Sequence, residues 1–207
     1  MNQSNYIFLS IVLIVWCIIH SVLISNKFIS FIKTILGTKF RFYRISYNLF
    51  SLITFIPIIL YSELNTGDYI FIWNGHLETI RGAILLFSLF LFSAGAKHYD
   101  GLVFLGIRQI KFFSNHKSLK ESGGLDMSGI LSVIRHPWYS ATILLLWTRN
   151  IDINICIVNV ILTAYLIIGS FLEEGKLSIE FGEKYRLYQQ NVSMLFPYKW
   201  FKSKIIR

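Results

Sequence analysis

The chain has 207 residues, of which 54% are hydrophobic and 15% are charged, and its formal net charge is +9. Soluble globular domains carry more charge and fewer apolar residues, and several apolar runs here approach the roughly 20 residues that cross a bilayer. The composition therefore excludes an ordinary soluble domain and predicts an all-α polytopic membrane protein, a helical bundle surrounded by a lipid bilayer.

Five membrane spans are predicted, and with a surface helix they form one integral membrane domain over residues 1–207. In chain order the spans cover about residues 6–23, 45–61, 80–96, 129–148 and 153–172. A C-terminal cytoplasmic amphipathic helix is predicted over about residues 174–192, because apolar or aromatic side chains recur there every three or four residues. These side chains are Leu177, Phe181, Tyr185, Tyr188 and Val192.

The charges of the connecting segments predict the orientation of the spans. Residues 25–44 contain five Lys or Arg and no acid, whereas residues 62–79 contain three acids and no Lys or Arg. The first segment is predicted to be cytoplasmic, which puts the N-terminus outside and the C-terminus in the cytoplasm, across the inner membrane if the source is a bacterium. The basic segments then face anionic lipid, so no nucleic-acid partner is predicted despite the positive charge. The oligomeric state is left open.

The fourth span contains the sequence RHPWYSATILLLW, in which Arg135 and His136 precede Pro137. A helix from Pro137 to Thr148 would be about 18 Å long, too short for a hydrocarbon core of about 30 Å. A helix that starts at Gly129 would be long enough, but Pro137 would kink or break it. Both alternatives place Arg135 and His136 beside a helix N-terminus at the cytoplasmic edge.

A helix N-terminus next to an arginine suits an anion, because unpaired amides and the guanidinium both attract negative charge. Arg135 is therefore a candidate ligand for a carboxylate or phosphate, or alternatively a side chain that only reaches the lipid headgroups. The short link between the fourth and fifth spans predicts an antiparallel hairpin, which brings Glu173 and Glu174 to the same edge. Acids at a membrane edge are usually functional, although one of them could instead form a structural pair with Arg135.

Metal binding is not predicted from the sequence. The five histidines show no ligand spacing such as His-x-x-x-His, and Cys17 and Cys156 fall in different spans, where they suit packing. No pair of a histidine and an acid is apparent as a catalytic dyad, so no catalytic residue is assigned.

Two motifs in the C-terminal part of the chain resemble those of a family of membrane enzymes. The first is L-x-x-x-G-x-x-x-x-x-R-H-P-x-Y from Leu125 to Tyr139, and the second is E-E-x-x-L-x-x-x-F-G-x-x-Y-x-x-Y from Glu173 to Tyr188. Their order and spacing are similar to the isoprenylcysteine carboxyl methyltransferase and phospholipid methyltransferase superfamily. The N-terminal half, with His20, YNLFSLITF and LGIRQ, is similar in style to the NnrU and methanethiol S-methyltransferase branch.

The resemblance implies S-adenosylmethionine as cofactor and methyl donor, bound at the cytoplasmic edge. The cofactor-binding residues that it implies are Gln109, Leu125, Gly129, Arg135, His136, Pro137, Tyr139, Glu173 and Glu174. Arg135 and His136 suit the cofactor's carboxylate, and one of the two glutamates suits its ammonium. Tyr139 would line the pocket, and Gln109 and Leu125 would lie at the adenosine end.

Two positions depart from the family pattern. Ser140 stands where family members commonly have glycine, and Gly169 stands where isoprenylcysteine enzymes have an arginine thought to hold the substrate carboxylate. The implied acceptor is therefore a small thiol or another lipophilic substrate instead of a prenylated cysteine. An NADPH-dependent sterol-type membrane reductase and a non-catalytic membrane protein are the alternative functions.

Overall fold

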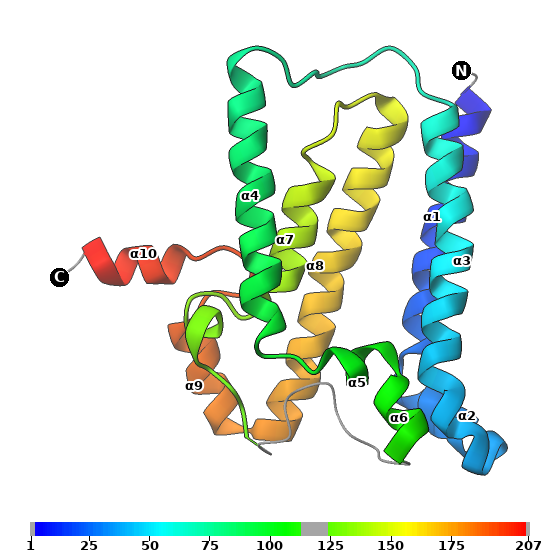
Figure 1. The fold of residues 1–207 in the computed structure, drawn as a ribbon, viewed down its shortest axis with the longest axis vertical. Helices are drawn as coiled ribbons and strands as arrows, with labels where there is room; N and C mark the ends of the chain where they lie inside the picture. Colours follow the sequence, from blue (N-terminus) through cyan, green and yellow to red (C-terminus); the bar gives the residue numbers. More distant parts are fainter. Residues whose placement is uncertain (1–2, 113–123, 206–207) are drawn as a thin grey trace. The chain divides into compact units, whose positions relative to one another are not determined.

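The computed structural model describes residues 3–112 and 124–205 of the chain (Figure 1). All regular elements within these ranges are helices, and Ile134 and Ser193 form an isolated parallel bridge. The prediction of an all-α protein is confirmed. The described residues pack as two compact units, the first from those within Met1–Ile70, Tyr99–Glu121 and Ile151–Ile161, and the second from those within Phe71–His98, Ser122–Asn150 and Leu162–Arg207.

The first unit contains two long helices that lie side by side, α1 (Gln3–Leu23) and α3 (Tyr43–Leu64) (Figure 1). Nε1 of Trp16 in α1 donates to Oγ1 of Thr54 in α3 at 3.0 Å, which satisfies two polar groups within a mainly apolar contact. The other elements of this unit are α2 (Asn26–Leu36), the 3-10 helix η1 (Gly37–Phe42), α5 (Gly101–Leu105), α6 (Ile107–Phe112) and the beginning of α8 (Ile153–Phe181).

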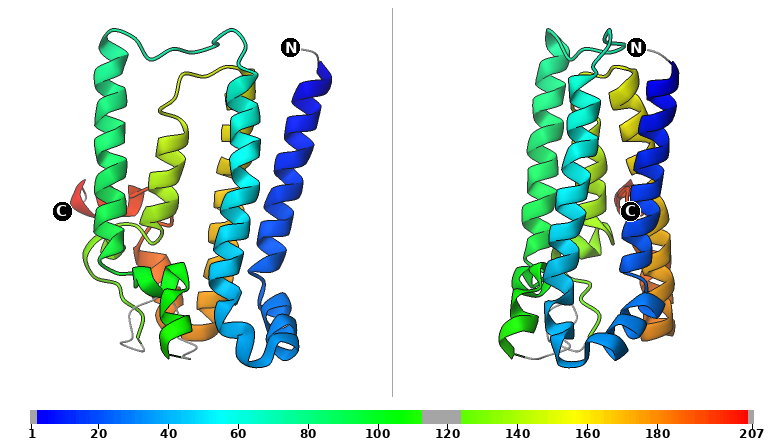
Figure 2. Two further views of the ribbon diagram at one scale, coloured as in Figure 1. Left: turned by 45° about the vertical axis from the view of Figure 1, so that its right-hand side comes forward. Right: turned by 90° about the vertical axis from the view of Figure 1, so that its right-hand side faces the viewer.

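The second unit contains α4 (His76–Ala96) and α7 (Pro137–Leu146), which lie side by side (Figure 2). Nε1 of Trp138 in α7 donates to the carbonyl of Phe92 in α4 at 3.0 Å. The other elements of this unit are the 3-10 helix η2 (Gly129–Ser132), the rest of α8, α9 (Glu183–Asn191) and α10 (Tyr198–Ile205).

Among the residues that the structure describes, four helical segments are long and apolar enough to cross a membrane, namely Gln3–Leu23, Asn26–Leu64, His76–Ala96 and Ile153–Phe181. The segment Asn26–Leu64 combines α2, η1 and α3. The chain is therefore an integral, polytopic membrane protein, as predicted.

The fourth predicted span, residues 129–148, does not form a helix of spanning length. It consists of η2, an irregular stretch over residues 133–136, and α7, whose 10 residues extend only about 15 Å. Pro137 explains the break, because its ring clashes with the carbonyl one turn earlier and it has no amide to donate. His136 accordingly has the non-helical angles φ −123° and ψ 68°.

The surface helix predicted over residues 174–192 is in fact divided between two helices. α8 continues past Leu172 to Phe181, and α9 starts after Gly182, whose φ of 55° lies in the left-handed region that favours glycine. The prediction placed the helix boundary where the sequence becomes polar. The backbone hydrogen bonds of a helix can continue from apolar into polar sequence. The end of the apolar run therefore does not fix the end of α8.

The apolar stripe predicted for this region is confirmed. The buried cluster comprises Tyr185, Tyr188 and Val192, packed against Leu125, Leu177 and Phe181. The hydroxyl of Tyr188 donates to the carbonyl of Leu131, which joins α9 to η2.

The predicted hairpin of α7 and the second part of α8 is also confirmed. Three contacts follow its length, Trp147 with Thr163, Tyr139 with Gly169 and Arg135 with Glu174. Residue numbers fall along α7 as they rise along α8, so the two segments are antiparallel. The end of α8 therefore returns to the start of α7.

Close packing of α4 on α7 depends on Gly95, since a Cβ atom there would lie 2.6 Å from Cδ1 and Nε1 of Trp138. The Gly95→Ala variant is expected to lose about 1 to 3 kcal/mol of stability through overpacking. Thermal unfolding in detergent, followed by tryptophan fluorescence, measures the loss. Gly82→Ala in the same helix is the matched control, because its Cβ would meet nothing within 4 Å. Equal unfolding temperatures for the two variants would contradict this packing.

Candidate functional site

The backbone of Arg135 and His136 is held by the segment that follows α9. The amide of Arg135 donates to the carbonyl of Ser193 at 2.9 Å, and the amide of His136 donates to that of Met194 at 3.0 Å. Oγ of Ser140, one turn into α7, donates to the carbonyl of Leu195 at 2.7 Å. The serine that stands in place of the family's glycine therefore helps to fix the break before α7.

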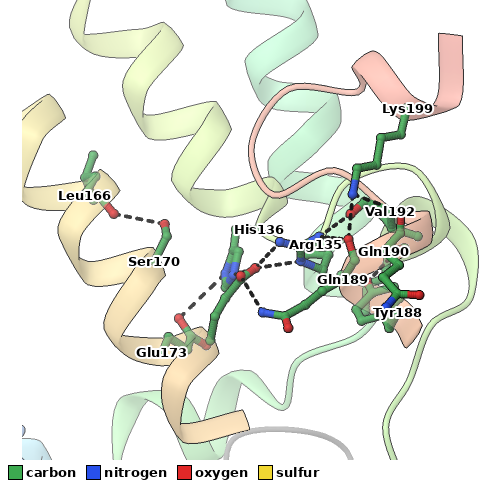
Figure 3. A network of polar contacts seen from close by, with 12 residues as sticks. Arg135, His136, Leu166, Ser170, Glu173, Tyr188, Gln189, Gln190, Val192 and Lys199 are labelled. Carbon is green, nitrogen blue, oxygen red and sulfur yellow. Dashed lines mark hydrogen bonds and ion pairs between the residues drawn. The ribbon is translucent and has the colours of Figure 1, made fainter. Parts of the chain in front are cut away.

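The guanidinium of Arg135 makes polar contacts with all three of its nitrogens (Figure 3). Nε and Nη2 each lie 2.6 Å from Oε1 of Glu174 at the end of α8. Nη1 donates to the carbonyls of Gln189, at 3.1 Å, and Val192. The Arg135 side chain is only 7% exposed, so it joins α8 and α9 inside the protein. The structural pair that the sequence left open as an alternative is thus present, and Glu174 is the partner.

His136 lies between the two glutamates. Its Nε2 is 3.2 Å from Oε1 of Glu174, and its Nδ1 is 3.8 Å from Oε2 of Glu173. Oε2 of Glu174 also accepts from Nε2 of Gln189 at 2.9 Å, so Glu174 is buried and fully paired. The Glu173 side chain is 39% exposed, and within the described ranges its one polar contact is with His136. Of the two carboxylates, only that of Glu173 is available to a ligand.

Three residues of this network were missed by the sequence analysis as polar or ionic partners. Gln189 contacts both Arg135 and Glu174. Nζ of Lys199 donates to the carbonyls of Gln189 and Gln190 at the end of α9. Tyr185 is completely buried, and burial raises the pKa of its phenol, which keeps it neutral. The helical spacing of Tyr185 and Gln189, four residues apart, was the signal available in the sequence.

The structure brings together six of the predicted site residues, namely Arg135, His136, Pro137, Tyr139, Glu173 and Glu174. The ring of Tyr139 stands edge-on to that of His136, with centroids 5.4 Å apart. Leu125 instead packs in the cluster under α9. Gln109 belongs to the first unit, where its Nε2 donates to the carbonyl of Val103; its Oε1 is buried without a hydrogen-bond partner among the described residues.

A histidine–acid pair, which was not apparent in the sequence, lies in the second unit. Nδ1 of His98 is 2.7 Å from Oδ2 of Asp126. The two residues are 28 positions apart, in the segments that follow α4 and precede η2, so only the fold brings them together. Gly129, one of the predicted site residues, lies against this pair, since a Cβ atom there would be 2.9 Å from Nε2 of His98.

Comparison with known proteins identifies relatives of the chain. A family described as NnrU protein matches residues 8–172. A methanethiol S-methyltransferase of Pseudomonas deceptionensis is 39% identical over 69 residues, which cover 33% of this chain and 26% of that protein. The methanethiol S-methyltransferase of Pseudomonas sp. strain GM41 is 28% identical over 135 residues, 61% of this chain and 50% of that protein.

A third relative is the methanethiol S-methyltransferase of Crocosphaera subtropica, which is 26% identical over 136 residues, 61% of this chain and 51% of that protein. The chain thus spans about half the length, or less, of the curated relatives that it matches. No solved structure shows a significant match.

Proposed function

The chain belongs to the NnrU family, and from this we propose that it is a membrane methyltransferase that transfers a methyl group from S-adenosylmethionine to a small thiol. The site is proposed to lie at the cytoplasmic edge of the membrane, with the N-terminus outside and the C-terminus in the cytoplasm. In a bacterium this membrane would be the inner one.

The observation that carries the proposal is the difference between the two glutamates. Both carboxylate oxygens of Glu174 are occupied by contacts with Arg135, His136 and Gln189. The Glu173 carboxylate faces His136 and is partly exposed. The amino acid end of S-adenosylmethionine has an ammonium that suits the partly exposed Glu173 carboxylate. The Glu173 carboxylate therefore fits the ammonium end of this cofactor.

The remaining residues of the cluster are assigned supporting roles. Arg135, with its nitrogens on protein acceptors, is a positioning residue that holds α8 against α9. The side chains of Tyr139 and His136 would line the site and exclude water from it. The bound cofactor supplies a methyl group on a sulfonium, which reacts by in-line displacement, so the protein mainly has to align the two reactants.

A small acceptor is proposed for two reasons. The matched relatives carry the name methanethiol S-methyltransferase. The position of the arginine found in isoprenylcysteine enzymes is Gly169, which provides no charge for a substrate carboxylate, and a Cβ atom there would already lie 3.5 Å from the ring of Tyr139.

The proposal is tested with the full chain purified in detergent. Isothermal titration is expected to detect binding of S-adenosylmethionine and no binding of NADPH. Labelled methyl donor is then offered with small alkyl thiols, phosphatidylethanolamine and a prenylcysteine analogue, and label is expected in the thioether product of the thiols. Binding of NADPH without binding of S-adenosylmethionine would indicate a reductase instead of a methyltransferase. Transfer of the methyl group to none of the acceptors would favour a non-catalytic protein.

A further inference from the structure

The pair of His98 and Asp126 has the geometry of a general base and its orienting carboxylate. Oδ2 of Asp126 lies 2.7 Å from Nδ1 of His98, and Oδ1 accepts from the amide and hydroxyl of Ser128 at 3.0 and 2.7 Å. The hydrogen bond from His98, followed by that from the Ser128 amide, lowers the pKa of Asp126 to about 2. A charged carboxylate can only accept, so the proton of the neutral imidazole lies on Nδ1 and Nε2 carries the lone pair.

Nε2 of His98 has no hydrogen-bond partner within the described part of the chain. It lies against Gly129, whose φ is 54°. Any larger residue at position 129 would be strained in this conformation and would press on the imidazole. The His98 side chain is 11% exposed, so its basic nitrogen is held in a confined place and remains available for a proton.

The pair lies at the end of α4 that packs on the start of α7. The amide of His98 donates to the carbonyl of Gly95 at 2.9 Å, so the two residues are one turn apart. Gly95 is the residue that meets Pro137 and Trp138. The imidazole is therefore at the same end of the second unit as His136, which directly precedes Pro137.

We propose that His98 is the general base of the methyl transfer and that Asp126 is its positioning residue. This inference rests on the proposed function. Nε2 of His98 takes the proton from the thiol S–H as the sulfur's electron pair forms the new carbon–sulfur bond. The bond between the methyl carbon and the donor's sulfonium breaks, its electron pair stays on the donor sulfur, and the proton passes from His98 to water. The products are a methyl thioether, S-adenosylhomocysteine and one proton.

The groups that surround His98 define the pH dependence. Asp126 is the charged side chain in direct contact. Among the elements packed against α4, η2 carries no titratable side chain, and α7 carries Tyr139, preceded by Arg135 and His136. Because an alkyl thiol ionises mainly above neutral pH, a base at this point matters at neutral pH, where the thiol still carries its proton.

The test compares two acceptors in the wild type and in His98→Asn. With an alkyl thiol at neutral pH, the variant is expected to lose about 10²- to 10⁴-fold in kcat, the usual contribution of a general base. With an arylthiol that is already ionised, the loss should be small, because no proton has to be removed. The rate of the variant with the alkyl thiol should rise with pH towards that of the wild type, while binding of S-adenosylmethionine stays unchanged. Asp126→Asn is expected to show the same pattern with a smaller loss.

Equal losses with both thiols, or no loss with either, would overturn the role of His98 while leaving the methyltransferase intact. A wild-type protein that methylates neither thiol would overturn the proposed function and this inference with it. Thermal unfolding and cofactor titration show whether His98→Asn is folded, and if it is not, the acceptor comparison with Asp126→Asn decides.

Discussion

The Arg135→Ala variant is expected to lose about 3 to 5 kcal/mol of its unfolding free energy, because a buried carboxylate keeps its charge without its guanidinium partner. The side chains of Arg135 and Glu174 are 7% and 8% exposed, so water cannot replace the lost contact. The carbonyls of Gln189 and Val192 lose a donor in the same change. The end of α8 and the end of α9 should separate, and binding of S-adenosylmethionine should be lost with them.

Thermal unfolding in detergent measures the loss of stability, and Arg186→Ala is the matched control. Arg186 pairs with Glu183 at 2.7 Å in α9, but the two side chains are 65% and 76% exposed. An exposed pair contributes about 0 to 1 kcal/mol. Unfolding temperatures that fall equally in both variants would show that the Arg135 pair is not the buried connection described above.

A double variant separates stability from function in the same experiment. Replacing Arg135 by methionine and Glu174 by leucine removes both charges together, and such changes are often neutral or stabilising. The double variant is therefore expected to recover much of the stability that Arg135→Ala loses. It should not recover cofactor binding, because the Glu174 carboxylate that orients the His136 ring through Nε2 is then missing.

The Glu173→Gln variant is expected to weaken binding of S-adenosylmethionine about 10- to 150-fold, the value of a hydrogen bond to a charged group, about 1.5 to 3 kcal/mol. Its unfolding temperature should change little, because the only polar contact that Glu173 makes within the described ranges is with His136, at 3.8 Å. Isothermal titration measures the affinity. Glu180→Gln, at an exposed position of the same helix, is the matched control and should bind the cofactor normally.

The comparison with Glu174→Gln decides which glutamate meets the cofactor. Glu174 accepts from Arg135, His136 and Gln189, so its substitution should lower the unfolding temperature first and affinity only as a consequence. Unchanged affinity in Glu173→Gln would show that the cofactor's ammonium does not bind this carboxylate. The assignment of roles to the two glutamates would then be wrong.

Much of the second unit could be predicted from the sequence, because it follows from local patterns. Apolar runs predicted the long helices, and Pro137 predicted the break before α7. The short link before residue 153 predicted the hairpin of α7 and α8, which brings Arg135 to Glu174. Residues spaced by three or four gave the buried stripe of α9. In each case the physical cause acts within a few residues or along one pair of neighbouring helices.

What the sequence determined by itself is that Arg135, His136, Glu173 and Glu174 meet at one end of a hairpin in an all-helical membrane protein. Tertiary packing decided which glutamate is buried, since consecutive residues on a helix point about 100° apart and the rotation of α8 is set by its neighbours. It also decided that residues 193–195 support the break before α7, and that Asp126 reaches His98. These contacts join segments far apart in the chain, and no local pattern of residues encodes them.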